Sequence, residues 1–199
     1  MTQRILKAAT LLVALLLTVQ SSAQSLAESD LVAALREGGL VLVMRHTNAP
    51  RELPDAAIVQ PDNVRGERQL DEQGRRDATL LGESLRRQQV VISAVLSSPT
   101  YRALETARLA GFDDVTVREE LGNEGMREAS AQRAEWLQMQ VAVRPDKGNH
   151  LLITHGPNLN AAFPEHAAGM EEGDMLVFAP AAGKNGVVAI IKIGDWSAL

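Results

Sequence analysis

Short uninterrupted apolar runs alternate along this chain with longer segments in which apolar residues recur at helical spacing. Runs bounded by glycine or polar residues are typical of buried strands, and recurrence every three or four residues is typical of amphipathic helices. The runs predict strands at residues 40–44, 90–96, 115–117, 150–154, 174–178 and 187–193. The helical pattern predicts helices at residues 29–37, 71–89, 97–110 and 126–141. This alternation predicts an α/β fold, a three-layer sandwich in which helices flank a mainly parallel central sheet.

Residues 47–69 lie between the first predicted strand and the next helix and show no sustained periodicity. They include three prolines and several charged residues, which predicts a long loop over one end of the sheet. A loop of this length in a compact domain is usually either functional or disordered. We expect substrate selection to reside in this loop and in residues 156–174.

The first 23 residues have the layout of a secretory signal peptide. Arg4 and Lys7 precede an uncharged apolar run at residues 8–19, and small residues follow as far as Ala23. The run is shorter than the roughly 20 residues that a membrane-spanning helix needs. We expect cleavage near Ala23, a single mature domain of residues 24–199, a periplasmic or secreted location and no stable membrane association after cleavage. An uncleaved N-terminal anchor is the alternative.

Composition and charge narrow the possible chemistry. The chain has no cysteine, which excludes disulfides, thiolate metal ligands and thiol nucleophiles. The formal net charge is −5, and it becomes −7 when Arg4 and Lys7 leave with the signal peptide. Such a balance argues against nucleic acid as a partner, so any site for an anion must be local.

Polar side chains with chemical potential follow three of the predicted strands. Arg45 and His46 end the first strand, Ser97 and Ser98 end the second, and His155 ends the strand at 150–154. Ligands of such sheets bind beyond the carboxyl ends of the strands. We therefore expect these side chains to gather at one site.

The residue types at these ends suit phosphoryl chemistry. An imidazole such as His46 is a good nucleophile near neutral pH, and the guanidinium of Arg45 can bind two phosphoryl oxygens. Arg102 falls in the first turn of a predicted helix, where free N–H groups already favour an anion. His155 can stabilise charge in the transition state. His150 has no comparable context, and neither has the fourth histidine, at position 166.

Three ordered motifs resemble those of the histidine phosphatase superfamily, which includes phosphoglycerate mutases and histidine acid phosphatases. They are LVMRH at 42–46, SSPTYRALETA at 97–107 and ITHG at 153–156, supported by LDEQGR at 70–75. The resemblance extends from about residue 40 to 178 and implies a phosphoglycerate mutase-like fold.

The resemblance also assigns roles. It implies that His46 is the nucleophile that becomes phosphorylated, that Arg45 and Arg102 hold the phosphate and that His155 is the second histidine of the pocket. These four residues would form both the catalytic and the phosphate-binding set. The resemblance implies neither a metal nor a cofactor, and the expected partner is a small phosphorylated substrate.

Two positions depart from the family pattern. Thr47 stands where glycine commonly follows the first histidine, and Gly156 stands where one branch has an aspartate that acts as the general acid. The other branch takes a glutamate from the loop after the third strand, which here offers Glu119, Glu120 and Glu124. Of these we favour Glu124 as the acid.

The sequence leaves several functions open. Glu172 and Asp174 are substitutes for the acid. The leading hypothesis is an exported phosphatase that acts on a phosphomonoester or a phosphohistidine. The alternative is a binding protein that keeps the anion pocket but has little or no turnover. A two-histidine metal site is poorly supported, because no further ligand lies at helical spacing from His46 or His155.

Overall fold

The computed structural model describes residues 28–123, 130–180 and 186–199. The predicted signal peptide lies outside these residues, as does Glu124. The strands are β1 Val41–Arg45, β2 Ile92–Ser97, β3 Val115–Val117, β4 Asn149–Thr154, β5 Met175–Phe178 and β6 Val187–Ile191. The α-helices are α1 Glu28–Glu37, α2 Glu72–Arg87, α3 Tyr101–Leu109, α4 Ala131–Val141, α5 Gly156–Ala162 and α6 Pro164–Ala167, and the two 3₁₀ helices are η1 Glu119–Leu121 and η2 Ile193–Ser197.

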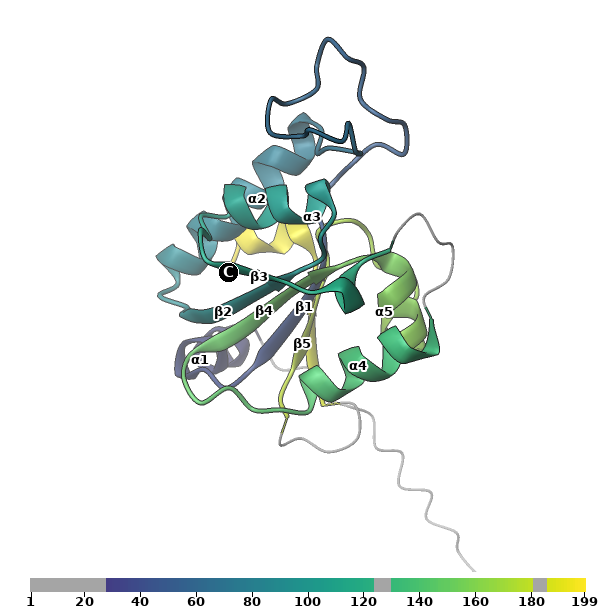
Figure 1. Ribbon diagram of the computed structural model, residues 1–199. Helices are drawn as coiled ribbons and strands as arrows, with labels where there is room; N and C mark the ends of the chain where they lie inside the picture. Colours follow the sequence, from purple (N-terminus) through teal and green to yellow (C-terminus); the bar gives the residue numbers. More distant parts are fainter. Residues whose placement is uncertain (1–27, 124–129, 181–185) are drawn as a thin grey trace, which may run out of the picture.

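The six strands form one sheet in the order β3-β2-β4-β1-β5-β6 (Figure 1). β3, β2, β4 and β1 are parallel neighbours, whereas β5 is antiparallel to β1 and β6 is antiparallel to β5. With helices on both faces, this arrangement confirms the predicted three-layer sandwich with a mainly parallel sheet. The last strand is shorter than predicted, since the chain turns into η2 at Ile193.

Side chains of β1 alternate between two separate cores. Leu42 and Met44 pack with residues of α1, α2 and α3, while Val41 and Val43 pack with residues of α4, α5 and α6. This alternation follows from the pleat of a strand, in which successive side chains point to opposite faces. The side chains of Arg45 and His46, the two residues that follow Met44, must therefore point to opposite faces of the sheet.

Helix ends agree with ordinary capping chemistry. Asp71 caps α2 and accepts a hydrogen bond from Gly74 N at 2.8 Å, and Ser130 caps α4 in the same way. The structure places the start of α4 at Ala131, and the four residues before Ser130 in the predicted helix lie outside the described part of the chain. Thr100 precedes α3 but makes no side-chain cap bond.

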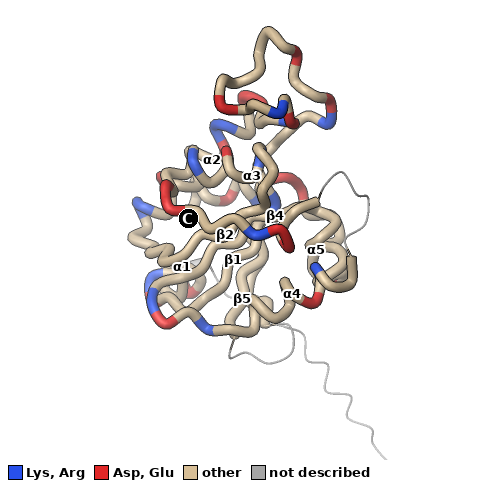
Figure 2. The backbone as a smooth tube through the Cα atoms, in the orientation of Figure 1, with Lys and Arg blue, Asp and Glu red and all other residues tan. Residues whose placement is uncertain are grey.

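Charge is concentrated outside the sheet. Within the six described strands, Arg45 is the single charged residue, and Figure 2 shows the remaining Lys, Arg, Asp and Glu residues on helices and loops. The loop between β1 and α2 extends away from the layered body (Figure 1) and has no helix or strand of its own, as predicted. No helix within the described residues is long and apolar enough to cross a membrane.

Gly82 lies where α2 approaches the end of α3 closely. An added Cβ at Gly82 would lie 2.0 Å from the carbonyl oxygen of Ala110. We expect Gly82→Ala to destabilise the protein by about 1–3 kcal/mol through this overlap. Helix propensity alone predicts a gain of about 1 kcal/mol, so the sign decides between the two effects. Urea unfolding measures it, with Gly194→Ala as a control, because a Cβ there would meet no atom within 4 Å.

Candidate active site

The two pocket histidines follow neighbouring parallel strands at the same level. Arg45 of β1 pairs in register with Thr154 of β4, so His46 and His155 are the next residues along each strand. Both continue the alternation that faces α1, α2 and α3, because Met44 and Ile153 lie in that core. Their ring centroids are 5.2 Å apart with an interplanar angle of 63°. The parallel register therefore brings the two imidazoles together.

Arg102 lies between the two imidazoles. It is the second residue of α3, and only 7% of its surface is exposed. Its Nε donates to His46 Nε2 at 3.1 Å, and its Nη2 donates to His155 Nδ1 at 3.1 Å. These contacts join the ends of three elements through one guanidinium.

The partners of His46 fix its protonation. The Thr47 carbonyl can only accept, so Nδ1 carries the hydrogen in the 2.8 Å contact between them. Arg102 can only donate, so His46 Nε2 holds a lone pair. Burial lowers the pKa of His46 from its ordinary 6.5 to about 3, and the positive charges of Arg102 and Arg45 act in the same direction, against the Thr47 hydrogen bond. His46 is thus a neutral imidazole with an unprotonated Nε2.

His155 adopts the opposite tautomer. Its Nδ1 accepts from Arg102, so Nε2 carries the hydrogen and donates to Ser98 Oγ at 2.8 Å. Burial holds the pKa of His155 far below its ordinary value, and the neighbouring His46 and Arg102 add to the effect. Both imidazoles are therefore uncharged near neutral pH.

Arg102 carries the positive charge of this cluster. Burial lowers its pKa to about 10, with a further contribution from the nearby charge of Arg68, and the group remains a cation at neutral pH. It lies in the first turn of α3, where the helix dipole is unfavourable for a cation but favourable for an anion. A buried cation at this end of the helix predisposes the site to bind an anion.

Arg45 lies on the other face of the sheet end from His46. Its Nη2 donates to Glu172 Oε1 at 2.6 Å, and its Nη1 donates to the Met170 carbonyl at 3.3 Å. Its Nε is buried and has no hydrogen-bond partner among the described residues. The structure thus places Arg45 at the site, with its Nη atoms bonded to Glu172 and Met170.

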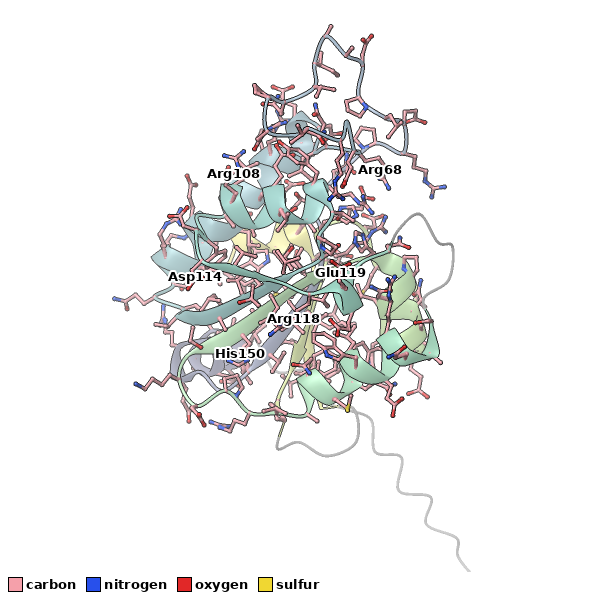
Figure 3. The ribbon with its side chains drawn as sticks, viewed as in Figure 1. Arg68, Arg108, Asp114, Arg118, Glu119 and His150 are labelled. Atoms are coloured by element: carbon pink, nitrogen blue, oxygen red, sulfur yellow. The ribbon has the colours of Figure 1, made fainter. Side chains whose placement is uncertain are left out.

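Arg68 is a site residue that the motif analysis did not single out. It lies at the end of the loop between β1 and α2 (Figure 3), and its Nε donates to the Pro50 carbonyl at 2.6 Å. Its positive charge lowers the pKa of His46, His155 and Arg102. The signal in the sequence is weak: a basic residue two positions before Leu70, which begins the LDEQGR stretch.

A cleft of about 450 Å³ opens beside these groups. Arg68 and Arg102 line it, together with Thr100. The other lining residues come from the loop between β1 and α2, from the turn before α3 and from the segment after β3. They are Leu53, Arg65, Glu67, Pro99, Glu119, Gly122 and Asn123.

The acid candidates separate in space. Glu119 lines the cleft (Figure 3), whereas Glu120 is not among its lining residues in the described part of the chain. Asp174 is buried and bonded to Lys192 Nζ at 2.7 Å, so it has a structural role. Glu124 lies outside the described residues, and its assignment as the acid stays a prediction.

Thr47 and the other two histidines have simple structural explanations. The Thr47 hydroxyl lies 3.2 Å from the hydroxyl of Thr106, and Thr47 N donates to the same oxygen at 3.2 Å. The side chain therefore packs away from the strand end and is fully buried. His150 lies in the first half of β4, and His166 lies in α6. Within the described residues, no three His, Asp or Glu side chains gather as a metal site requires.

Comparison with known families decides the classification. Residues 41–141, which include β1, α2, β2 and α3, match the sequence profile described as histidine phosphatase superfamily (branch 1). The chain belongs to the histidine phosphatase superfamily. The matched span includes His46 and Arg102 and ends before His155.

Solved structures share the superfamily fold. The protein histidine phosphatase SixA complexed with tungstate aligns with a TM-score of 0.56 at 19% identity, over 78% of this chain and 98% of that one. Rv3214 from Mycobacterium tuberculosis aligns with a TM-score of 0.51 at 18% identity, over 76% and 95%. TTHB049 from Thermus thermophilus gives 0.51 at 16% identity, over 77% and 99%. No curated protein sequence gives a significant match.

The depressed histidine pKa values make stability depend on pH. Below the ordinary value of 6.5 the unfolded chain protonates His46, whereas the folded superfamily site stays neutral down to about 3. The stability contributed by the neutral form is complete above pH 6.5 and is lost as the pH falls. Each such histidine should lower the free energy of unfolding by up to about 1.4 kcal/mol per pH unit in this window.

Urea unfolding at a series of pH values measures this slope. His46→Gln and His155→Gln should each flatten the decline below pH 6.5. His166→Gln, at a half-buried position of α6, is the matched control for the substitution of a histidine elsewhere in the chain. Equal slopes in all four proteins would contradict the assignment of two neutral buried imidazoles.

Proposed function

We propose that this superfamily member is an exported phosphatase that hydrolyses a phosphomonoester or a phosphohistidine through a phosphohistidine intermediate on His46. One observation supports this proposal above the others. His46 Nε2 is held unprotonated, and the buried Arg102 cation lies 3.1 Å from it. The proposed nucleophile, His46, therefore lies next to a guanidinium that can bind the phosphoryl oxygens.

In the first proposed step, His46 Nε2 forms a bond to phosphorus, the bond from phosphorus to the leaving oxygen of an ester or the leaving nitrogen of a phosphohistidine breaks, and the leaving atom takes a proton from the acid or from water. Arg102 Nε donates to that nitrogen in the structure. A charged phosphoryl oxygen is a stronger acceptor than a neutral imidazole, so substrate binding would draw the Arg102 donors to the phosphoryl group and free the lone pair. The hydrogen on Nδ1, held by the Thr47 carbonyl, stays in place throughout.

In the second step, water attacks phosphorus, the bond from phosphorus to His46 breaks, and inorganic phosphate leaves. Charge develops on the equatorial oxygens in both steps. Arg102, Arg45 and Arg68 supply positive charge, and the imidazole of His155 is a further polar group beside the phosphoryl group. These side chains would stabilise the transition state without a metal or cofactor.

The cellular setting is part of the proposal and depends on residues 1–23. Their signal-peptide layout supports export to the periplasm or beyond, followed by release from the membrane. The cleft of about 450 Å³ suits a small phosphorylated substrate. The net charge of −5 supports a partner other than nucleic acid.

A second candidate function is an anion-binding protein with little turnover. One observation favours it: Glu172 lies 2.6 Å from Arg45 Nη2 and 3.7 Å from Arg68 Nη2. Two of the three arginines thus already have an anionic partner. In addition, Gly156 follows His155 at the position where one branch of the superfamily carries its acid.

Hydrolysis of 4-nitrophenyl phosphate by the mature protein tests the first proposal. This leaving group needs no protonation, so a pocket that lacks only its acid still turns it over. We expect activity that persists with a metal chelator and falls by on the order of 10⁴-fold in His46→Ala, because the nucleophile is lost. Acid-quenched mass spectrometry should detect a phosphoryl group on His46 in the wild type.

His150→Ala is the control, since His150 lies in the first half of β4 and outside the pocket. It should keep the wild-type rate. A folded wild-type protein that binds phosphate or tungstate but hydrolyses no ester would reject the phosphatase proposal in favour of the binding protein.

The leaving group can identify the acid. A variant without the acid should lose on the order of 10²-fold in activity toward phenyl phosphate and much less toward 4-nitrophenyl phosphate, because only the first needs a proton. We expect this pattern for Glu124→Gln or for Glu119→Gln, whose carboxylate lines the cleft. Glu120→Gln is the matched control. Equal losses with both substrates in every variant would argue that none of these glutamates is the acid.

A further inference from the structure

Glu172 brings together three donors from separate parts of the chain. Its Oε1 accepts from Arg45 Nη2 at 2.6 Å and lies 3.7 Å from Arg68 Nη2. Its Oε2 accepts from the backbone N–H of Ala49 at 2.8 Å. The donors come from the end of β1 and from the two ends of the loop between β1 and α2. One carboxylate therefore connects the arginines to the base of that loop.

The turn that carries Glu172 is itself fixed. Asp174 accepts from Glu171 N at 2.8 Å and from Lys192 Nζ at 2.7 Å. Gly173 N donates to the His46 carbonyl at 3.0 Å, which ties the turn to the residue that carries the nucleophile. Gly173 has φ +94°, and a Cβ there would lie 2.8 Å from Ile193, so this close turn requires glycine.

Both oxygens of Glu172 are engaged, and its side chain is only 14% exposed. A carboxylate that donates a proton to a leaving group needs a free oxygen directed at the substrate. The contacts of Glu172 instead match a residue that orients other groups. It is also absent from the residues that line the cleft in the described structure.

Arg45 and Arg68 need such a partner. Each has the other as a neighbouring positive charge, and this repulsion contributes to the lowered pKa of Arg68, after burial. Glu172 opposes that effect and raises the pKa of Arg68. Arg68 also donates to the carbonyls of Ala49 and Pro50, so its guanidinium is held on one side by the loop and on the other by Glu172.

We propose that Glu172 is a positioning residue: it holds Arg45 and Arg68 beside the pocket in an orientation that strengthens the binding of a tetrahedral oxyanion. The inference rests on the proposed function only in taking a phosphoryl group as the natural ligand. Arg45 keeps its buried Nε without a partner among the described residues, while Nη1 and Nη2 are occupied. A guanidinium held at both Nη atoms loses little side-chain entropy when an anion binds beside it.

Competition between Glu172 and the anion would change the binding affinity in the opposite direction. A carboxylate this close to two arginines could compete with the anion, in which case removing its charge would tighten binding. Glutamine separates the two effects because it has nearly the shape of glutamate. Its oxygen can accept from either Arg45 or Ala49, but its NH₂ group must then face the other donor. Positioning therefore predicts weaker binding, and competition predicts stronger binding.

Calorimetric titration with tungstate tests the sign. The matched control is Glu171→Gln, which removes one negative charge from the exposed neighbouring position of the same turn. We expect Glu172→Gln to bind tungstate about tenfold more weakly than Glu171→Gln, as the loss of one charge-assisted hydrogen bond implies. Glu172→Ala should bind still more weakly. With 4-nitrophenyl phosphate, the loss should appear mainly as a higher KM.

Glu172→Gln that binds tungstate as tightly as Glu171→Gln, or more tightly, overturns the inference. If Glu172→Ala fails to fold, the glutamine variant decides alone, and its thermal midpoint without anion checks that it is folded. A wild-type protein that binds no tungstate also overturns the inference. A wild type that binds tungstate but hydrolyses nothing rejects the phosphatase proposal, while the comparison of Glu172→Gln with Glu171→Gln still decides this one.

Discussion

The site depends on a buried cation whose closest polar contacts are imidazole nitrogens. Arg102 donates to His46 Nε2 and to His155 Nδ1, and it forms no ion pair within the described residues. A buried charge is expensive, and the nearby positive charge of Arg68 adds to the cost while Glu67 and Glu172 oppose it, so Arg102 needs hydrogen-bond acceptors in direct contact. The imidazoles meet this requirement only when they are neutral. The same constraint that keeps Nε2 of His46 unprotonated leaves Arg102 ready for an anion.

Hydrogen bonds from neighbouring residues hold both imidazoles in the tautomers that Arg102 requires. The Thr47 carbonyl fixes the hydrogen on His46 Nδ1, and Ser98 at the end of β2 accepts from His155 Nε2. Thr106 in α3 donates to the Arg102 carbonyl at 2.8 Å and accepts from Thr47 N. The two threonines thus link the strand end that carries His46 to the helix that carries Arg102. Thr47, where the family pattern commonly has glycine, is accommodated because its buried side chain contacts Thr106.

Sequence periodicity predicted which way the side chains of β1 face and which strand ends meet. The alternation of Leu42 and Met44 with Val41 and Val43 follows from the apolar run, and it places His46 and Arg45 on opposite faces. The meeting of His46 and His155 was expected from strand ends alone. The contacts of Glu172 with Arg45 and Ala49 were not, since they span more than 120 residues and depend on a turn before an antiparallel strand. Such contacts leave no periodic signal in the sequence, so Glu172 could be considered only as an acid.

Opposite faces also explain why adjacent residues of β1 contribute differently. His46 points to the face covered by α3, where it contacts Arg102, while Arg45 points to the face of α5. There the Arg45 guanidinium lies 3.7 Å from the position of a Cβ on Gly156. A larger residue at 156 would therefore contact Arg45 directly. With glycine there, the counter-charge for Arg45 comes from Glu172 in the following turn, at 2.6 Å. Gly156 and Glu172 thus both bear on the position of Arg45, because the glycine leaves room for the guanidinium and the carboxylate pairs with it.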